Sequence, residues 1–148
     1  MKFVILVTLI LTAMLSAKEY KVVFNCSSGD ANYINSRVWL VGKTIDMIEE
    51  QGDRATVAMT LHGACVPMVS KEYHEVVDME DITDIQTAQN NLIELMQSKK
   101  VEVVACAMSL ARAKIDHKDV LPMVKISKNS FIDTIRYQND GYALMTFK

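Results

Sequence analysis

Short apolar runs rich in β-branched residues alternate with amphipathic stretches along the chain, and this alternation restricts the fold more than any other feature. Apolar residues at spacings of three and four, such as Ile34, Val38 and Val41, predict a helix that begins after the capping residue Asp30 and ends near Gly52. Further helices are expected over 85–98, 106–113 and 129–138, the last with Phe131, Ile132 and Ile135 as its apolar residues. Strands are expected over 20–25, 55–61, 101–105, 123–126 and 142–147.

Strands that alternate with helices predict a parallel sheet covered by helices on both faces. We therefore expect a three-layer, flavodoxin-like α/β domain with a five-stranded, mainly parallel sheet. In the flavodoxin-like strand order, the first strand lies between the second and the third. Ligands of such sheets bind outside the carboxyl ends of the strands, so functional residues are sought there.

The first 17 residues have the pattern of a secretory signal. Lys2 is followed by an apolar run over 3–15 and by the small pair Ser16-Ala17, and the run is too short for a comfortable membrane span. We expect cleavage and export to the periplasm or an equivalent space, although an uncleaved anchor is the alternative. Residues 18–148 then form one domain, with no further membrane span. The formal net charge of -2 gives no reason to expect nucleic-acid binding.

Cys106 stands directly between a predicted strand and a predicted helix, and is the strongest candidate for a working residue. Free N–H groups and the helix dipole at such a position favour the thiolate, the nucleophilic form of cysteine. They would equally stabilise the terminal sulfur of a persulfide. The alternative is a small buried side chain with no chemistry, because free cysteine is among the most buried residue types.

The chain contains two more cysteines, Cys26 and Cys65, each at or just past the end of a predicted strand, and His62 precedes Cys65 by three residues. These three are candidates for an auxiliary or resolving role beside Cys106. In an oxidising compartment, either a Cys26–Cys65 or a Cys65–Cys106 disulfide is compatible with the sequence. We expect no metal site, because no CxxC or HxxxH pair anchors one. Residues 27–29 lie where flavodoxins hold the phosphate of a flavin, but Asp30 follows directly and its negative charge opposes a phosphate. We therefore also expect no cofactor.

Several segments in their order resemble one family. They are KVVFN with SSGD near the start, LHG at 61–63, VEVVACAMSLARAKI at 101–115 and SFIDTIRYQNDGYALMTF at 130–147. The chain from 20 to 147 resembles the DsrE/DsrF/TusD-like sulfur-relay family, especially its exported small members. The resemblance implies a flavodoxin-like domain that forms homo- or hetero-oligomers, often trimers or hexamers. It also implies that the cysteine matching Cys106 carries sulfur as a persulfide. The additional Cys26 and Cys65 depart from the family pattern and raise the question of whether Cys106 acts alone.

These observations lead to one functional hypothesis and one alternative. The hypothesis is an exported sulfur carrier, with sulfurtransferase activity left open, that accepts sulfane sulfur on Cys106 and passes it to a partner. Its partners would be donor and acceptor proteins or small sulfane-sulfur compounds, and the chain would form a homo-oligomer. The alternative is a non-catalytic oligomeric module of the same fold that binds a small ligand or a protein and has structural cysteines.

Overall fold

The computed structural model describes residues 17–148, so the predicted signal peptide lies almost entirely outside the described residues. Five strands alternate with helices along the chain. The strands are β1 (Glu19–Cys26), β2 (Arg54–Leu61), β3 (Glu102–Cys106), β4 (Lys125–Ser127) and β5 (Ala143–Phe147). The α-helices are α1 (Ala31–Glu50), α2 (Ile82–Ser98), α3 (Ala107–Arg112) and α4 (Ser130–Asn139). Short 3₁₀ segments are η1 (Gly63–Val69), η2 (Tyr73–Glu75) and η3 (His117–Asp119).

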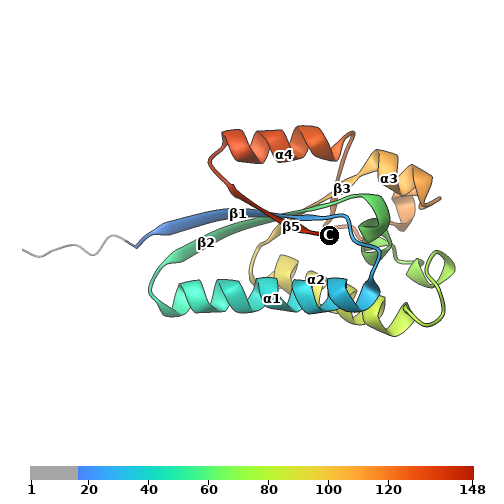
Figure 1. The fold of residues 1–148 in the computed structure, drawn as a ribbon, viewed down its shortest axis with the longest axis horizontal. Helices are drawn as coiled ribbons and strands as arrows, with labels where there is room; N and C mark the ends of the chain where they lie inside the picture. Colours follow the sequence, from blue (N-terminus) through green and yellow to red (C-terminus); the bar gives the residue numbers. More distant parts are fainter. Residues whose placement is uncertain (1–16) are drawn as a thin grey trace, which may run out of the picture.

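All strand pairs in the sheet are parallel, and helices cover both of its faces. In Figure 1, α1 and α2 lie together on one face, while α3 and α4 lie on the other. The predicted three-layer α/β class is therefore confirmed. The predicted elements are also present, with boundaries shifted by only a few residues. The side chain of Asp30 caps α1 as expected, and Gly52 follows the end of this helix with a positive φ of 80°.

The strand order is β4-β3-β2-β1-β5, so the expectation that the first strand lies between the second and the third is wrong. β2 occupies that position instead. The reason is that α1 and α2 pack side by side on one face, so the first two crossovers move the chain in the same direction across the sheet. The apolar pattern of a helix shows that it has a buried side, but it does not show which face of the sheet that side covers.

The main core lies between the sheet and the pair α1 and α2. Helix α1 contributes Ile34, Val38, Val41 and Ile45, as its spacing predicts, and the buried side of α2 includes Leu92. The last five residues of β2, the central strand, are buried. Within residues 17–148, no helix combines the length and the apolar character that a membrane span needs.

Helix α4 exposes its apolar residues to solvent, whereas an amphipathic helix normally buries them against the sheet. Its apolar residues Phe131, Ile132 and Ile135 are 70%, 64% and 60% exposed, while Asp133 and Tyr137 face the sheet and are buried. The hydroxyl of Tyr137 donates a hydrogen bond to the Glu102 carboxylate on β3. The inward side of α4 is thus held by polar contacts, which leaves an apolar surface outside. We call Phe131, Ile132 and Ile135 the outward face of α4.

Candidate functional site

Cys106 is the last residue of β3 and the N-cap of α3, so the predicted strand–cysteine–helix junction is present. Its side chain is 5% exposed, and its thiol is the free one among the described cysteines. The parallel pairing places Cys106 beside Ser127, the last residue of β4, and helix α4 starts three residues after Ser127. The beginnings of two helices, α3 and α4, therefore meet at one sulfur atom.

The surroundings of the sulfur favour its ionised form. Burial raises the pKa of the Cys106 thiol, but polar donors outweigh this and leave the pKa below its ordinary value. These donors are backbone N–H groups of Ser109 and Ser130, the Ser109 hydroxyl and the backbone of Met108. The sulfur makes no strict capping hydrogen bond, so the N–H groups act as nearby dipoles that stabilise a thiolate. A persulfide ending in S⁻ would meet the same donors.

A buried carboxylate lies behind this part of the site. The Ser127 hydroxyl donates to Asp133 Oδ2, and Asp133 Oδ1 lies 3.5 Å from a guanidinium nitrogen of Arg136. Asp133 is 5% exposed, so its charge needs these partners. The contacts hold the first turn of α4 against the end of β4. They consequently position the Ser130 N–H that faces the Cys106 sulfur.

Cys26 and Cys65 form a disulfide with a Cα–Cα distance of 5.9 Å, the first of the two pairings that the sequence allowed. Both half-cystines are fully buried. Cys26 is aligned with Leu61 on β2, and Leu61 with Ala105 on β3, so Cys26 lies two strands away from the end of β3. Two strand spacings amount to about 10 Å, beyond the Cα separation that a disulfide tolerates. Neither residue offers a free thiol to resolve a persulfide on Cys106 in this structure.

His62 follows β2 at the same sheet edge. Its ring meets the ring of Phe131 edge-on at 6.5 Å between centroids, and Phe131 directly follows Ser130. Burial lowers the pKa of His62, so the imidazole is neutral at neutral pH. The structure therefore brings His62 to the side of the site where α4 begins. A neutral imidazole there can accept or donate one hydrogen bond to an incoming group.

Ser109, Ser127, Ser130 and Asp133 are site residues that the sequence interpretation missed. Ser109 had a local signal, because a serine three residues after an N-cap lies on the same helical turn as the capping residue. The other three come from β4 and α4, and only the pairing of β3 with β4 brings them to Cys106. No spacing along the chain predicts that pairing.

The two other ligand classes considered for the sequence gain no structural support. Cys65 is bonded to Cys26, so its sulfur is not available as a thiolate metal ligand with His62. In residues 17–148, the metal-like grouping of side chains is Glu72, His74 and Glu75; all three are solvent-exposed, and none of the cysteines belongs to the group. In the loop at 27–29, a Cβ on Gly29 would lie 3.0 Å from Ala64 Cβ, so a larger residue does not fit there.

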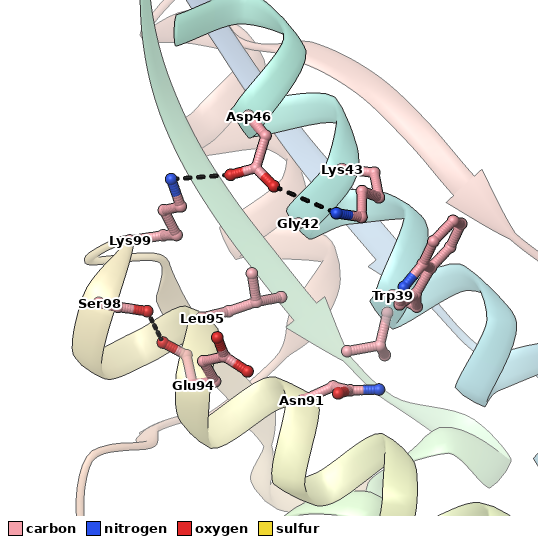
Figure 2. A pocket seen from close by; sticks show the side chains of 10 residues that line it. Trp39, Gly42, Lys43, Asp46, Asn91, Glu94, Leu95, Ser98 and Lys99 are labelled. Carbon is pink, nitrogen blue, oxygen red and sulfur yellow. Dashed lines mark hydrogen bonds and ion pairs between the residues drawn. The ribbon is translucent and has the colours of Figure 1, made fainter. Parts of the chain in front are cut away.

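A small cleft between α1 and α2 is a separate feature (Figure 2). It has a volume of about 190 Å³, which is below the usual size of small-ligand pockets. Both of its lysines are paired with Asp46: Lys99 Nζ lies 2.9 Å and Lys43 Nζ 3.7 Å from that carboxylate. Lys99 Nζ also lies 2.7 Å from Glu49. The cleft is lined by side chains of α1 and α2 and of Lys99, and it contains none of the cysteines.

The fold and the site define a class: a single parallel α/β domain whose free cysteine stands at the carboxyl edge of the sheet between two helix N-termini. The family model of the DsrE/DsrF-like family matches residues 18–147, and the chain belongs to this family. An uncharacterized protein of Aquifex aeolicus (strain VF5) is 33% identical over 139 residues, which cover 94% of this chain. The match covers 61% of that relative, so the chain spans less than two thirds of its length.

A solved structure has the same fold. It is MTH1491 of Methanobacterium thermoautotrophicum, a protein described as of unknown function. The TM-score is 0.63 at 19% identity, with 86% of this chain and 99% of that chain covered. The predicted family and fold class are confirmed by these matches.

Proposed function

We propose that this protein is an exported sulfur carrier that holds sulfane sulfur on Cys106 as a persulfide. The observation that carries the proposal is the environment of the one free thiol among residues 17–148: backbone donors from α3 and α4 and the Ser109 hydroxyl lower the pKa of its sulfur. These groups favour a thiolate before sulfur is loaded and a persulfide anion afterwards. Family membership supports the same chemistry.

The transfer needs no external oxidant. The Cys106 thiolate attacks the terminal sulfur of a donor persulfide R–S–SH, the donor S–S bond breaks, and R–SH leaves with the proton. Cys106–S–S⁻ remains at the site. A thiol of the acceptor then becomes the new persulfide when its thiolate attacks the terminal sulfur, and the Cys106 thiolate is regenerated. In this proposal, His62, whose ring contacts Phe131 beside Ser130, binds the incoming sulfur species.

Export is part of the proposal, and it places the signal peptide at residues 1–17. The buried Cys26–Cys65 disulfide supports an oxidising compartment such as the periplasm, because disulfides persist there and are rare in the cytosol. The outward face of α4 supports contact with a second protein surface, since three large apolar side chains side by side are unusual on an isolated domain. We propose that this surface serves homo-oligomerisation, with donor and acceptor proteins reaching Cys106 beside it.

The test is loading with inorganic polysulfide, followed by intact-mass measurement and release of sulfur by cyanide. Wild type is expected to gain one sulfur on Cys106 and to release thiocyanate. Cys106→Ala, which keeps the disulfide and has no free thiol among residues 17–148, is expected to gain none. Equal sulfur adducts on the two proteins would overturn the assignment.

The alternative is a non-catalytic binding module with structural cysteines. It is favoured by two observations, the fully buried disulfide and the 5% exposure of Cys106. Thiol titration of the native protein separates the two functions. Reaction of Cys106 in the folded state supports the carrier, whereas a thiol that reacts only after unfolding supports the module.

A further inference from the structure

The Ser109 hydroxyl lies between the Cys106 sulfur and the backbone of the neighbouring segment η1. It accepts a hydrogen bond of 2.9 Å from the Gly63 N–H, across 46 residues of sequence. Ser109 also lies on the first turn of α3, three residues after the N-cap Cys106, and its hydroxyl helps to lower the pKa of that thiol. A hydroxyl has a single hydrogen to donate. Since the oxygen already accepts from Gly63, donation of its hydrogen to the sulfur would complete an N–H···O–H···S chain. Such chains polarise and strengthen their members.

Gly63 can donate to Ser109 from this turn because a glycine tolerates the backbone conformation that the turn requires. Its φ is +56°, in the region that favours glycine, and a Cβ there would lie 3.3 Å from the Ser27 carbonyl oxygen. The same turn is fixed at its start, because the His62 N–H donates to the Cys26 carbonyl oxygen at 2.9 Å. Gly63 is therefore held tightly against the end of β1.

The Cys26–Cys65 disulfide closes this arrangement. It joins the last residue of β1 to η1 two residues beyond Gly63, and the Cys65 N–H also donates to the His62 carbonyl oxygen at 3.1 Å. The segment from His62 to Cys65 is thus tied to β1 at both ends. Because Gly63 lies between the two ties, its N–H has little freedom to turn away from Ser109.

We propose that the Cys26–Cys65 disulfide positions Gly63 so that the Ser109 hydroxyl is held as a hydrogen-bond donor to the Cys106 sulfur. Cys26 and Cys65 then do not resolve a persulfide. Their disulfide instead influences the acidity of the Cys106 thiol through Gly63 and Ser109. In this arrangement Ser109 is the donor to the sulfur, whereas Gly63 and the disulfide are positioning elements. The inference rests on the proposed role of Cys106 as the working thiol and adds what controls its acidity.

The experiment measures how the rate of Cys106 alkylation by iodoacetamide depends on pH in the full chain. Ser109→Ala removes the donor, so we expect the apparent pKa of Cys106 to rise and the rate at pH 7 to fall about three- to tenfold. Ser109→Thr restores a hydroxyl and is expected to recover most of the rate. Ser98→Ala is the matched control, because this exposed hydroxyl donates to the Glu94 carbonyl oxygen on α2, away from the site.

A double-mutant cycle tests the disulfide. Cys26→Ala with Cys65→Ala is expected to raise the apparent pKa of Cys106 in the same direction, and to add no further shift when Ser109 is already alanine. Gly63→Ala, which strains the same turn and keeps the disulfide, is the second variant if the double alanine protein does not fold. An unchanged pH profile in Ser109→Ala, or fully additive shifts in the cycle, would overturn the inference.

Alkylation needs no sulfur donor, so the two proposals fail separately. A shifted profile in Ser109→Ala together with no persulfide on wild type would reject the carrier function and keep the Ser109 arrangement. Persulfide formation on wild type with an unshifted Ser109→Ala profile would do the reverse.

Discussion

Cys106 shows how a nearly buried thiol can remain acidic. Removal from water alone would keep the sulfur protonated, because the charged form loses the most solvation. The surrounding N–H groups and the Ser109 hydroxyl replace that solvation, and the net direction of the pKa is downward. The site therefore combines low exposure with a sulfur that still ionises.

Tyr137 and Glu102 form the polar anchor of α4 and permit a pH-dependent prediction. Burial raises the pKa of the Glu102 carboxyl, but hydrogen bonds from Lys125 and Tyr137 outweigh it and hold the pKa below its ordinary value of 4.5. A carboxyl whose pKa is lowered by folding stabilises the fold above its unfolded pKa. That stabilisation is lost as the pH falls through the lowered value.

We expect Tyr137→Phe to lower the free energy of unfolding by about 1–2 kcal/mol at pH 7, since it removes a hydrogen bond to a charged group. The difference from wild type should be complete above pH 4.5 and shrink at lower pH, as Glu102 becomes protonated. Urea unfolding at several pH values measures it. Tyr142→Phe is the control, because the Tyr142 ring packs on Tyr137 at 5.0 Å and its hydroxyl makes no side-chain hydrogen bond within residues 17–148. An equal loss in both variants would contradict the prediction.

At the scale of elements, α4 differs from the other long helices. Helices α1 and α2 bury their apolar sides, whereas α4 buries Asp133 and Tyr137 and exposes its apolar residues. The polar contact between Ser127 and Asp133 holds the start of this helix beside Cys106. The outward face of α4 then remains for contact with another molecule, directly beside the site.

Ile135→Glu tests whether the outward face of α4 mediates homo-oligomerisation. Ile135 is 60% exposed, so we expect the free energy of unfolding of the monomer to change by no more than about 0.5 kcal/mol. Assembly should weaken, because the charge would be buried in an apolar contact. Light scattering over a range of protein concentrations measures the assembly, and Gln86→Glu on the exposed side of α2 is the control. Wild type that stays monomeric at every concentration would contradict a homo-oligomeric surface.

At the scale of the whole molecule, the disulfide joins the end of β1 to the segment that follows β2. It closes a loop with a sequence separation of 39 and encloses all of α1 and β2. Cross-linking over such a loop reduces the conformational freedom of the unfolded chain. The bond therefore serves the stability of the domain as well as the geometry at Ser109.

Removal of the disulfide by Cys26→Ala with Cys65→Ala is expected to lower the free energy of unfolding by about 2–4 kcal/mol. Urea unfolding with and without reductant measures the change. Wild type should lose this stability when reduced, while the double variant should not respond to reductant. Cys106→Ala, which retains the bond, should still respond. A double variant that loses as much stability with reductant as wild type would show that the bond is not the cause.

Much of the fold could be predicted from the sequence, because strands and helices follow from local patterns. The spacing of Ile34, Val38 and Val41 predicts α1, and Asp30 and Gly52 predict its ends. The position of Cys106 between β3 and α3 could be predicted in the same way, since both neighbouring elements are contiguous with it. The family resemblance was likewise visible in short segments of the chain.

The sequence by itself determined the order of the elements, the α/β class and the placement of Cys106 at a strand–helix junction, because each depends on residues within about one helical turn or strand of one another. The tertiary structure decided that β2 lies in the centre, that Cys65 pairs with Cys26, and that Ser130 and Gly63 meet the site around Cys106. These contacts join residues far apart along the chain. They depend on which face of the sheet each helix covers, and the apolar periodicity of a helix is the same for either face.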